Sequence, residues 1–118
     1  MRILIADDNE FVRRGIFGLL AQQEGCEVCG EARDSADAIQ KASEVHPDLI
    51  LLDVSMPGKN GLETARVLKE TLPQVKILII TQHDPKQMLP RSLEVGANGC
   101  IDKARLGIDL VPAIRDLL

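Results

Sequence analysis

Two aliphatic runs of four residues each, Leu49–Leu52 and Ile77–Ile80, limit most narrowly what this chain can fold into. Each run is too short for a core helix and has the length of a strand. A strand that is apolar at every position, rather than at alternate positions, is buried on both faces, as the central strands of parallel sheets are. The two runs therefore predict a parallel sheet that is covered by helices on both sides.

The rest of the chain repeats this alternation of strand and helix. Shorter strand-like runs lie at Ile3–Ile5, Val28–Cys29 and Cys100–Ile101, and apolar residues at helical spacing follow each of them. The first helical stretch is expected to bury a stripe formed by Phe11, Val12, Gly15, Ile16, Leu19 and Leu20. Five strand–helix units in 118 residues predict an α/β domain with a doubly wound, five-stranded parallel sheet.

Capping residues and prolines predict details of three helices. Ser35 is the expected N-cap of the second helix. If Asp109 caps the fifth helix, Pro112 lies in its first turn, where its missing N–H costs no hydrogen bond. Pro90 falls inside the fourth helical stretch, residues 85–95, where it removes a backbone hydrogen bond. That stretch is therefore predicted to be short, kinked or mobile.

Composition narrows the classes of function. A net charge of −4 and a pI of about 5.1 weigh against a basic nucleic-acid-binding face. The only aromatic residues, Phe11 and Phe17, cannot form a stacking surface for single strands. No apolar run is long enough for a membrane span or a secretory signal. Three cysteines, an odd number, argue against a disulfide framework, so a reducing, cytoplasmic setting is expected.

Charged and hydroxyl residues follow four of the expected strands. They are Asp7, Asp8, Asp53, Thr81 and Lys103. Because the carboxyl ends of parallel strands share one edge of a sheet, these side chains are expected to converge. Carboxylates at one point repel each other unless a cation joins them, and oxygen ligands without His or Cys favour Mg²⁺ or Mn²⁺. With Lys103 as a counter-charge, the pattern indicates phosphoryl transfer with a carboxylate as the candidate nucleophile.

A series of short motifs runs through the chain in a fixed order. They are Ile3-Leu4-Ile5-Ala6-Asp7-Asp8, Asp48-Leu49-Ile50-Leu51-Leu52-Asp53, Met56-Pro57, Asn60-Gly61, Ile79-Ile80-Thr81, Gly96-Ala97-Asn98-Gly99 and Lys103. Together they resemble the receiver domain of two-component response regulators. Ala6–Asn9, Gly30–Ala32 and Ser55–Gly58 are most similar to the branch that carries a LuxR-type helix-turn-helix output. The resemblance covers residues 1–118, leaves no second domain in the chain, and implies a flavodoxin-like strand order of 2-1-3-4-5.

The resemblance also implies a role for each matching residue. Asp53 would accept the phosphoryl group. The ligands of Mg²⁺ (or Mn²⁺) would be Asp7 through water, Asp8, Asp53 and the backbone carbonyl of Ser55. Thr81 and Lys103 would bind the phosphoryl oxygens. Such a domain is not an enzyme acting on other substrates, because it catalyses only its own phosphorylation and dephosphorylation.

The implied function is two-component signal transduction. A sensor histidine kinase would donate the phosphoryl group, and phosphorylation would switch a protein-interaction surface. An output domain, through which transcription would be controlled, or a second copy in a homodimer would read that surface. The domain itself is expected to contact neither nucleic acid nor membrane. Leu118 lies on the apolar stripe of a helix, which is consistent with a longer protein and equally leaves a natural single-domain chain as an alternative.

Four residues modify this expectation. Gln82 stands where relatives commonly have a small residue, and would crowd access to the phosphoryl group. Cys100 stands where an aromatic switch residue is common, so the usual Thr-aromatic coupling is missing. Ala104 replaces the proline that often follows the lysine, so no cis-proline is available there. His83, beside the site, is either a modulator of phosphoryl lifetime or an ordinary surface residue.

Other functions remain open at this point. A docking module of receiver fold that is never phosphorylated is the main alternative. The intact acid cluster argues against it, whereas Gln82 and Cys100 keep it open. A metal-dependent phosphatase is disfavoured because Ala6–Asn9 lacks an Asp-x-Asp motif. A flavin-binding protein is disfavoured because no phosphate-binding loop follows Ala6. Cys26 and Cys29 have metal-ligand spacing, but in a strand they would face opposite ways, which favours core cysteines over a zinc site.

Overall fold

Strands and helices alternate along the chain as predicted. The computed structural model describes residues 1–58 and 60–118. The strands are β1 (Arg2–Ala6), β2 (Glu27–Ala32), β3 (Leu49–Asp53), β4 (Lys76–Thr81) and β5 (Gly99–Asp102). The helices are α1 (Glu10–Ala21), α2 (Ser35–Val45), α3 (Gly61–Thr71), α4 (Pro85–Glu94) and α5 (Leu106–Arg115), with a short 3₁₀ helix, η1 (Lys103–Arg105), before α5. All strand pairs are parallel in the order β2-β1-β3-β4-β5, which confirms the predicted fold class.

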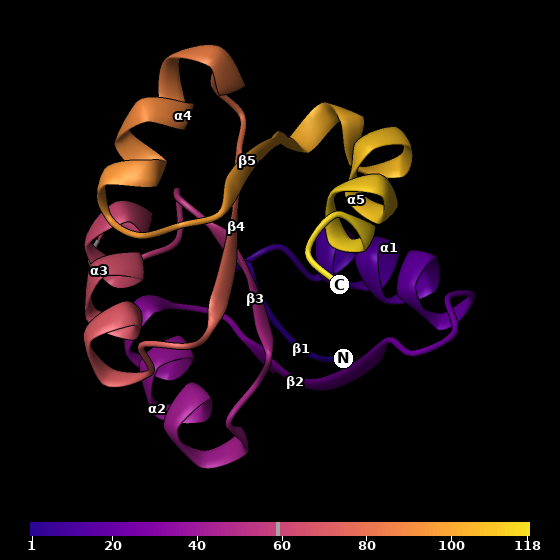
Figure 1. Ribbon diagram of the computed structural model, residues 1–118, viewed down its shortest axis with the longest axis horizontal. Helices are drawn as coiled ribbons and strands as arrows, with labels where there is room; N and C mark the ends of the chain where they lie inside the picture. Colours follow the sequence, from indigo (N-terminus) through magenta and orange to yellow (C-terminus); the bar gives the residue numbers. More distant parts are fainter. Residues whose placement is uncertain (59) are drawn as a thin grey trace.

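Helices cover both faces of the sheet (Figure 1). On one face α2, α3 and α4 pack over a core that includes Leu4, Ile50 and Ile77. On the other face α1 and α5 pack over a second core that includes Ile5 and Leu51. Every residue of β3 is buried, as its continuous apolar run predicts. Among the described residues, no helix is long and apolar enough to cross a membrane.

The strand register aligns the carboxyl ends of the central strands. Asp53, the last residue of β3, is the register partner of Ile80, so Thr81 on β4 lies one residue further on. Thr81 is in turn the partner of Asp102 on β5, which directly precedes Lys103. Residues that are far apart in the sequence are therefore brought to one edge of the sheet.

Two helix starts differ from the sequence-based predictions. Asp34, not Ser35, caps α2, because the Asp34 carboxylate accepts the backbone N–H of Asp37 at 2.8 Å. The Ser35 hydroxyl is buried inside the fold, where it accepts a hydrogen bond from Thr64 at 2.9 Å. The fifth helix begins at Leu106 rather than after Asp109, because η1 leads directly into it.

Asp109 consequently lies inside α5, where it pairs with Arg105 at 3.0 Å one turn earlier. Pro112 is an interior residue of this helix and not part of its first turn. In α4, Asp84 caps the helix, Pro85 occupies the first turn and the helix continues through Pro90. Two of five helices thus carry an internal proline, each of which removes one backbone hydrogen bond.

The buried stripe of α1 is also rotated from the predicted one. Phe11 is 86% exposed, whereas Arg13 is only 8% exposed and shares the buried face with Ile16 and Leu20. At 100° per residue, Phe11 lies about 180° from Leu20, and Arg13 lies about 20° from it. Helical geometry therefore places the arginine, rather than the phenylalanine, against the sheet.

The close approach of Gly61 to Val54, the residue after Asp53, can be tested by its effect on stability. A Cβ at this position would lie 2.3 Å from the Cα of Val54, which follows Asp53. Because the obstruction is backbone, Gly61→Ala should lower the free energy of unfolding by about 1–3 kcal/mol in urea titrations. The control is Gly18→Ala in α1, where, apart from the adjacent residues and the helix's own backbone, no described atom lies within 4 Å of the added Cβ. That exposed change should raise stability by about 0.5–1 kcal/mol, and equal losses in both variants would contradict the close approach at Gly61.

Candidate functional site

Three carboxylates meet at the carboxyl edge of the sheet. One oxygen from each of Asp7, Asp8 and Asp53 lies within 4.8 Å of the others. Asp7 and Asp8 occupy the loop between β1 and α1, and Asp53 ends β3. Asp7 and Asp53 are fully buried, and Asp8 is exposed. The structure therefore brings together the acidic residues that the sequence analysis selected.

Lys103 lies against the two buried members of this cluster. Its Nζ is 3.1 Å from Oδ2 of Asp7 and 3.4 Å from Oδ2 of Asp53. Lys103 begins η1, whose first turn is capped by the Asp102 carboxylate through the N–H of Ala104 at 2.9 Å. Burial alone would lower the pKa of Lys103, but its contact with Asp7 and the charges of Asp53 and Asp7 outweigh burial and raise it. The lysine is thus held as a cation.

The Asp7 carboxyl is in an unfavourable electrostatic position. Burial raises its pKa above the ordinary aspartate value, and the neighbouring charge of Asp53 acts in the same direction. The backbone N–H of Asn9 and the Lys103 ammonium oppose this rise without cancelling it. One ammonium group therefore does not fully compensate the buried negative charge.

Each buried carboxylate has one oxygen bound by its own loop and one oxygen turned to Lys103. The backbone N–H and the hydroxyl of Ser55 donate to Oδ1 of Asp53 at 3.1 and 2.9 Å. Oδ1 of Asp7 accepts the N–H of Asn9 at 2.8 Å. Oδ2 of Asp7 is buried and, apart from its ion pair with Lys103, has no hydrogen-bond partner among the described residues. Hard oxygens in excess of their donors are the ligands that Mg²⁺ and Mn²⁺ prefer, so the residues present fit such an ion.

The hydroxyl of Thr81 lies at the same edge, at the end of β4. The residue is fully buried, and its Oγ1 accepts the backbone N–H of His83 at 3.0 Å. Gln82 and His83 are exposed. Gln82 lines an open hollow of about 330 Å³ together with Asn9, Val12, Asp102, Lys103 and Ala104. The glutamine thus shares this hollow with Lys103, and its effect on access to the acid cluster stays a prediction.

Cys100 lies on β5, where its register partner is Ile79 of β4. It is half-buried on β5 and packs against the core beneath α2, α3 and α4. Burial raises the pKa of its thiol, while a contact with the Ser92 hydroxyl of α4 partly opposes this rise. All three cysteines, Cys26 and Cys29 included, are free thiols and half-buried. The residue at the expected switch position therefore contacts α4 through a small polar group instead of a ring.

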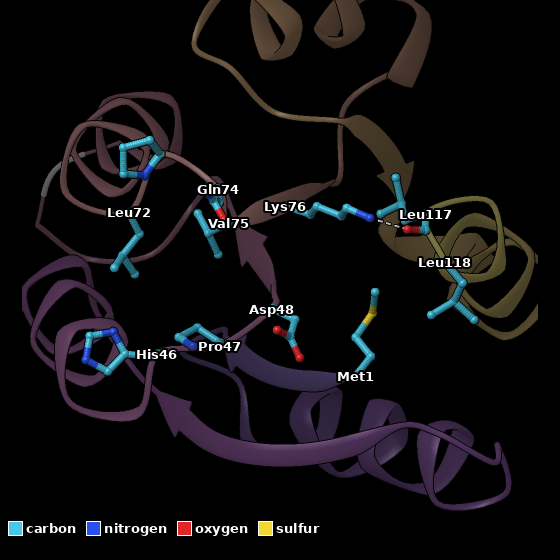
Figure 2. Close-up of a pocket in the computed structure, with 11 residues that line it drawn as sticks. Met1, His46, Pro47, Asp48, Leu72, Gln74, Val75, Lys76, Leu117 and Leu118 are labelled. Atoms are coloured by element: carbon cyan, nitrogen blue, oxygen red, sulfur yellow. Dashed lines mark hydrogen bonds between the residues drawn. The ribbon is translucent and has the colours of Figure 1, made fainter.

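A larger hollow, of about 760 Å³, lies at the opposite edge of the sheet. Figure 2 shows Asp48 and Lys76 there, at the amino ends of β3 and β4, with Met1 and Leu118 nearby. The Lys76 ammonium donates to the carbonyl of Leu117 and so fastens the end of α5. Within residues 1–58 and 60–118, the only group of three potential metal ligands is Asp7, Asp8 and Asp53. In the described part of the chain, the candidate metal ligands therefore gather at the carboxyl edge of the sheet.

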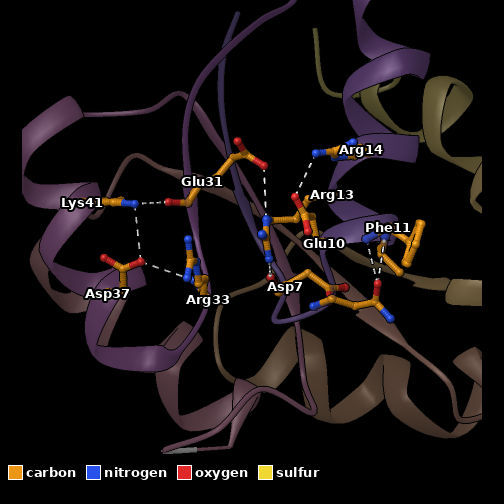
Figure 3. A network of polar contacts seen from close by, with 11 residues as sticks. Asp7, Glu10, Phe11, Arg13, Arg14, Glu31, Arg33, Asp37 and Lys41 are labelled. Carbon is orange, nitrogen blue, oxygen red and sulfur yellow. Dashed lines mark hydrogen bonds and ion pairs between the residues drawn. The ribbon is translucent and has the colours of Figure 1, made fainter.

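Sequence reasoning did not identify two charged residues that hold the acidic loop. Arg13 of α1 donates to the carbonyl of Asp7 at 2.7 Å and to the Glu31 carboxylate of β2 at 3.1 Å. Figure 3 shows the arginine between these two partners. The available signal was its position: Arg13 precedes Ile16 by three residues and Leu20 by seven, which places it on the buried stripe.

The fold and this edge of the sheet define the class of protein. Residues 3–115 match the response regulator receiver domain family, and the chain belongs to that family. It is 37% identical over 115 residues to the response regulator GacA of Pseudomonas viridiflava, covering 98% of this chain and 54% of that protein. It is 38% identical over 115 residues to the response regulator protein VraR of Staphylococcus epidermidis, covering 98% and 55%.

The structure is similar to that of a LuxR-family two-component response regulator from Aurantimonas sp. SI85-9A1. The TM-score is 0.92 at 32% sequence identity, with 98% of this chain and 83% of that chain covered. These relatives confirm the similarity to the LuxR-type branch. The chain spans about half the length of the curated relatives it matches.

The raised pKa of Asp7 predicts a pH dependence of stability in metal-free protein. In the pH interval between the ordinary aspartate pKa and the raised one, the folded protein holds more protons than the unfolded chain. The free energy of unfolding should therefore fall as the pH rises through this interval. Urea titrations at a series of pH values in the presence of a chelator should show this fall in wild-type protein and a flatter profile in Asp7→Asn. Parallel profiles of wild type and Asp7→Asn would contradict the raised pKa of Asp7 in the folded protein.

Proposed function

We propose that this chain is a phosphoacceptor in two-component signalling, with Asp53 as the accepting residue. The observation that carries the proposal is that the two carboxylate oxygens of Asp53 have different partners. Oδ1 is held by the N–H and hydroxyl of Ser55, and Oδ2 faces the ammonium of Lys103 at 3.4 Å. A fully buried carboxylate with one oxygen fixed and the other against a cation is oriented for attack on phosphorus.

The reaction transfers one phosphoryl group. A bond forms from a carboxylate oxygen of Asp53 to phosphorus as the phosphorus–nitrogen bond of a phosphohistidine breaks, and the imidazole nitrogen leaves with the electron pair. Lys103 and the hydroxyl of Thr81 bind the phosphoryl oxygens. Asp8, Asp53 and the Ser55 carbonyl would hold Mg²⁺ (or Mn²⁺), and Asp7 would contribute through water. When bound, the ion neutralises charge on the transferring group.

The partners follow from this chemistry. A sensor histidine kinase supplies the phosphohistidine, and water later hydrolyses the acyl phosphate with the same residues. We propose that residues 1–118 form one receiver unit, and that an output domain or a second copy of the chain responds to its phosphorylation. Transcription control is proposed because the relatives belong to LuxR-type regulators. A cytoplasmic setting is proposed because the three thiols are free.

Because Cys100 stands where an aromatic switch residue is common, phosphorylation has to reach the interaction surface by another route. After Thr81, the chain passes through Gln82 and His83 into α4. Because the backbone N–H of His83 donates to the Thr81 hydroxyl, a movement of that hydroxyl would shift the chain at the start of the helix. Pro90 removes one hydrogen bond of α4, and the Ser92 hydroxyl donates to the carbonyl of Met88 at 2.8 Å. A helix weakened in this way has a low free energy of local rearrangement, which makes α4 the proposed two-state element.

The decisive experiment is phosphorylation by a small phosphodonor in the presence of Mg²⁺. Intact-mass spectrometry should show one added phosphoryl group on the wild-type protein and none on Asp53→Ala. Lys103→Ala should reduce the labelled fraction, because the phosphoryl oxygens lose their cation. A control, Asp48→Ala, removes a carboxylate at the opposite edge of the sheet and should label normally.

Two other labelling results would contradict this assignment. Label that persists in Asp53→Ala would contradict the assigned acceptor. No label from small donors or from a range of histidine kinases would favour a docking module that is never phosphorylated.

The switch proposal predicts where the structure loosens or tightens. Phosphorylation should change amide hydrogen exchange mainly in residues 82–95, and Cys100→Ala should leave this response largely intact. The reason is that the connection runs through the backbone after Thr81 and not through the side chain of Cys100. A response confined to β5, or lost in Cys100→Ala, would show that Cys100 transmits the signal.

A further inference from the structure

Arg13 is a charged side chain on a buried helix face. It is 8% exposed and lies between α1 and the sheet, in line with Ile16 and Leu20. Burying a guanidinium without partners is costly, so a buried arginine is retained where its donors are used. Figure 3 shows where they go: one toward the loop after β1 and one toward β2.

The first partner is the backbone of the acidic loop. Asp7 follows the last residue of β1, and its N–H donates to the carbonyl of Ala32 at 3.0 Å. Its carbonyl, in contrast, accepts Nη1 of Arg13 at 2.7 Å in a buried contact. This carbonyl belongs to the peptide group that joins Asp7 to Asp8. Its orientation therefore sets where the chain enters Asp8 and how the two carboxylates are presented.

The second partner holds the arginine itself. Nε of Arg13 donates to Oε1 of Glu31 at 3.1 Å, and this carboxylate is half-exposed at the edge strand β2. The carbonyl of Glu31 accepts the ammonium of Lys41, which also pairs with Asp37 at 3.4 Å. One guanidinium thus ties the acidic loop to a strand that is anchored in turn to α2.

We propose that Arg13 is a positioning residue for divalent-cation binding, held in place by Glu31. This inference rests on the proposed function, since it assigns a role toward the Mg²⁺ site. Arg13 touches no carboxylate of the cluster and acts only through the Asp7–Asp8 peptide. Without it, the buried carbonyl loses its donor and the peptide turns to find another, which moves the carboxylates apart. Partners outside the first ligand sphere of a metal typically change affinity about 10- to 100-fold.

The test uses Mn²⁺ as the probe, with its affinity measured by water-proton relaxation. Arg13→Gln should weaken Mn²⁺ binding by about 10-fold or more relative to wild type. Arg14→Gln is the matched control, because it removes the same charge from the next residue of the same helix. Arg14 is exposed, and its only ion pair among the described residues is with Glu10, at 3.0 Å, so its loss should leave Mn²⁺ affinity unchanged.

A second variant keeps the proposal testable if Arg13→Gln folds poorly. Glu31→Ala removes the half-exposed partner and should weaken Mn²⁺ binding about two- to fivefold while the protein stays folded. Arg13→Lys keeps the charge but cannot serve both partners, so its affinity should lie between those of wild type and Arg13→Gln. Unfolding measured with chelator separates loss of stability from loss of metal affinity.

The inference is overturned if Arg13→Gln lowers stability but binds Mn²⁺ as tightly as Arg14→Gln does, or if Glu31→Ala binds Mn²⁺ like wild type. Wild-type protein that binds no Mn²⁺ would instead overturn the proposed metal site, and this inference with it. Binding in wild type that is lost in Asp8→Ala shows that the probe reports on the acid cluster.

Discussion

Repulsion between carboxylates at the end of the sheet is the constraint on which the rest of this structure depends. Asp7 and Asp53 are fully buried with Asp8 beside them, and a single ammonium, that of Lys103, lies 3.1 and 3.4 Å from the buried pair. The pKa of Asp7 stays raised despite this contact. A site in this condition would gain stability from a further cation, and under the proposed function that gain would couple metal binding to the fold.

The surrounding structure keeps these charges from moving apart. The central strands are buried on both faces and cannot shift without breaking two cores. Gly61 allows α3 to start against Val54, and its N–H donates to the Val54 carbonyl, so the chain after Asp53 is held against the start of α3. Arg13 holds the carbonyl of Asp7 from the side of α1. In contrast, α4 carries an internal proline and follows Thr81 closely in the chain, and it is the helix that we propose to rearrange.

Much of this arrangement could be predicted from the sequence, because it depends on local patterns. The continuous apolar runs of β3 and β4 indicated a parallel sheet, and the residues after each strand indicated an acidic edge. The order of the strands and the family followed from the resemblance of the motifs, and both are confirmed. The roles of Asp53, Thr81 and Lys103 remain predictions.

The incorrect and missing predictions have different physical causes. Asp34 and Ser35 are adjacent and both able to cap a helix, and packing against Thr64 decided between them. Phe11 is exposed and Arg13 is buried because the predicted stripe of α1 was too wide: the spacing to Ile16 and Leu20 places Arg13 on the buried side. Hydrogen-bond partners of a buried charge come from distant segments, so the role of Arg13 could not be read from its neighbours in the sequence.

The most direct test of the acid cluster as a divalent-cation site is paramagnetic broadening of backbone amide signals by Mn²⁺. Substoichiometric Mn²⁺ should first broaden the amides around Asp8 and Asp53, then those of Thr81 and Lys103, while amides around Lys76 at the opposite edge of the sheet remain sharp. Broadening that begins near Lys76, or that is uniform over the surface, would contradict a cation site formed by the three carboxylates.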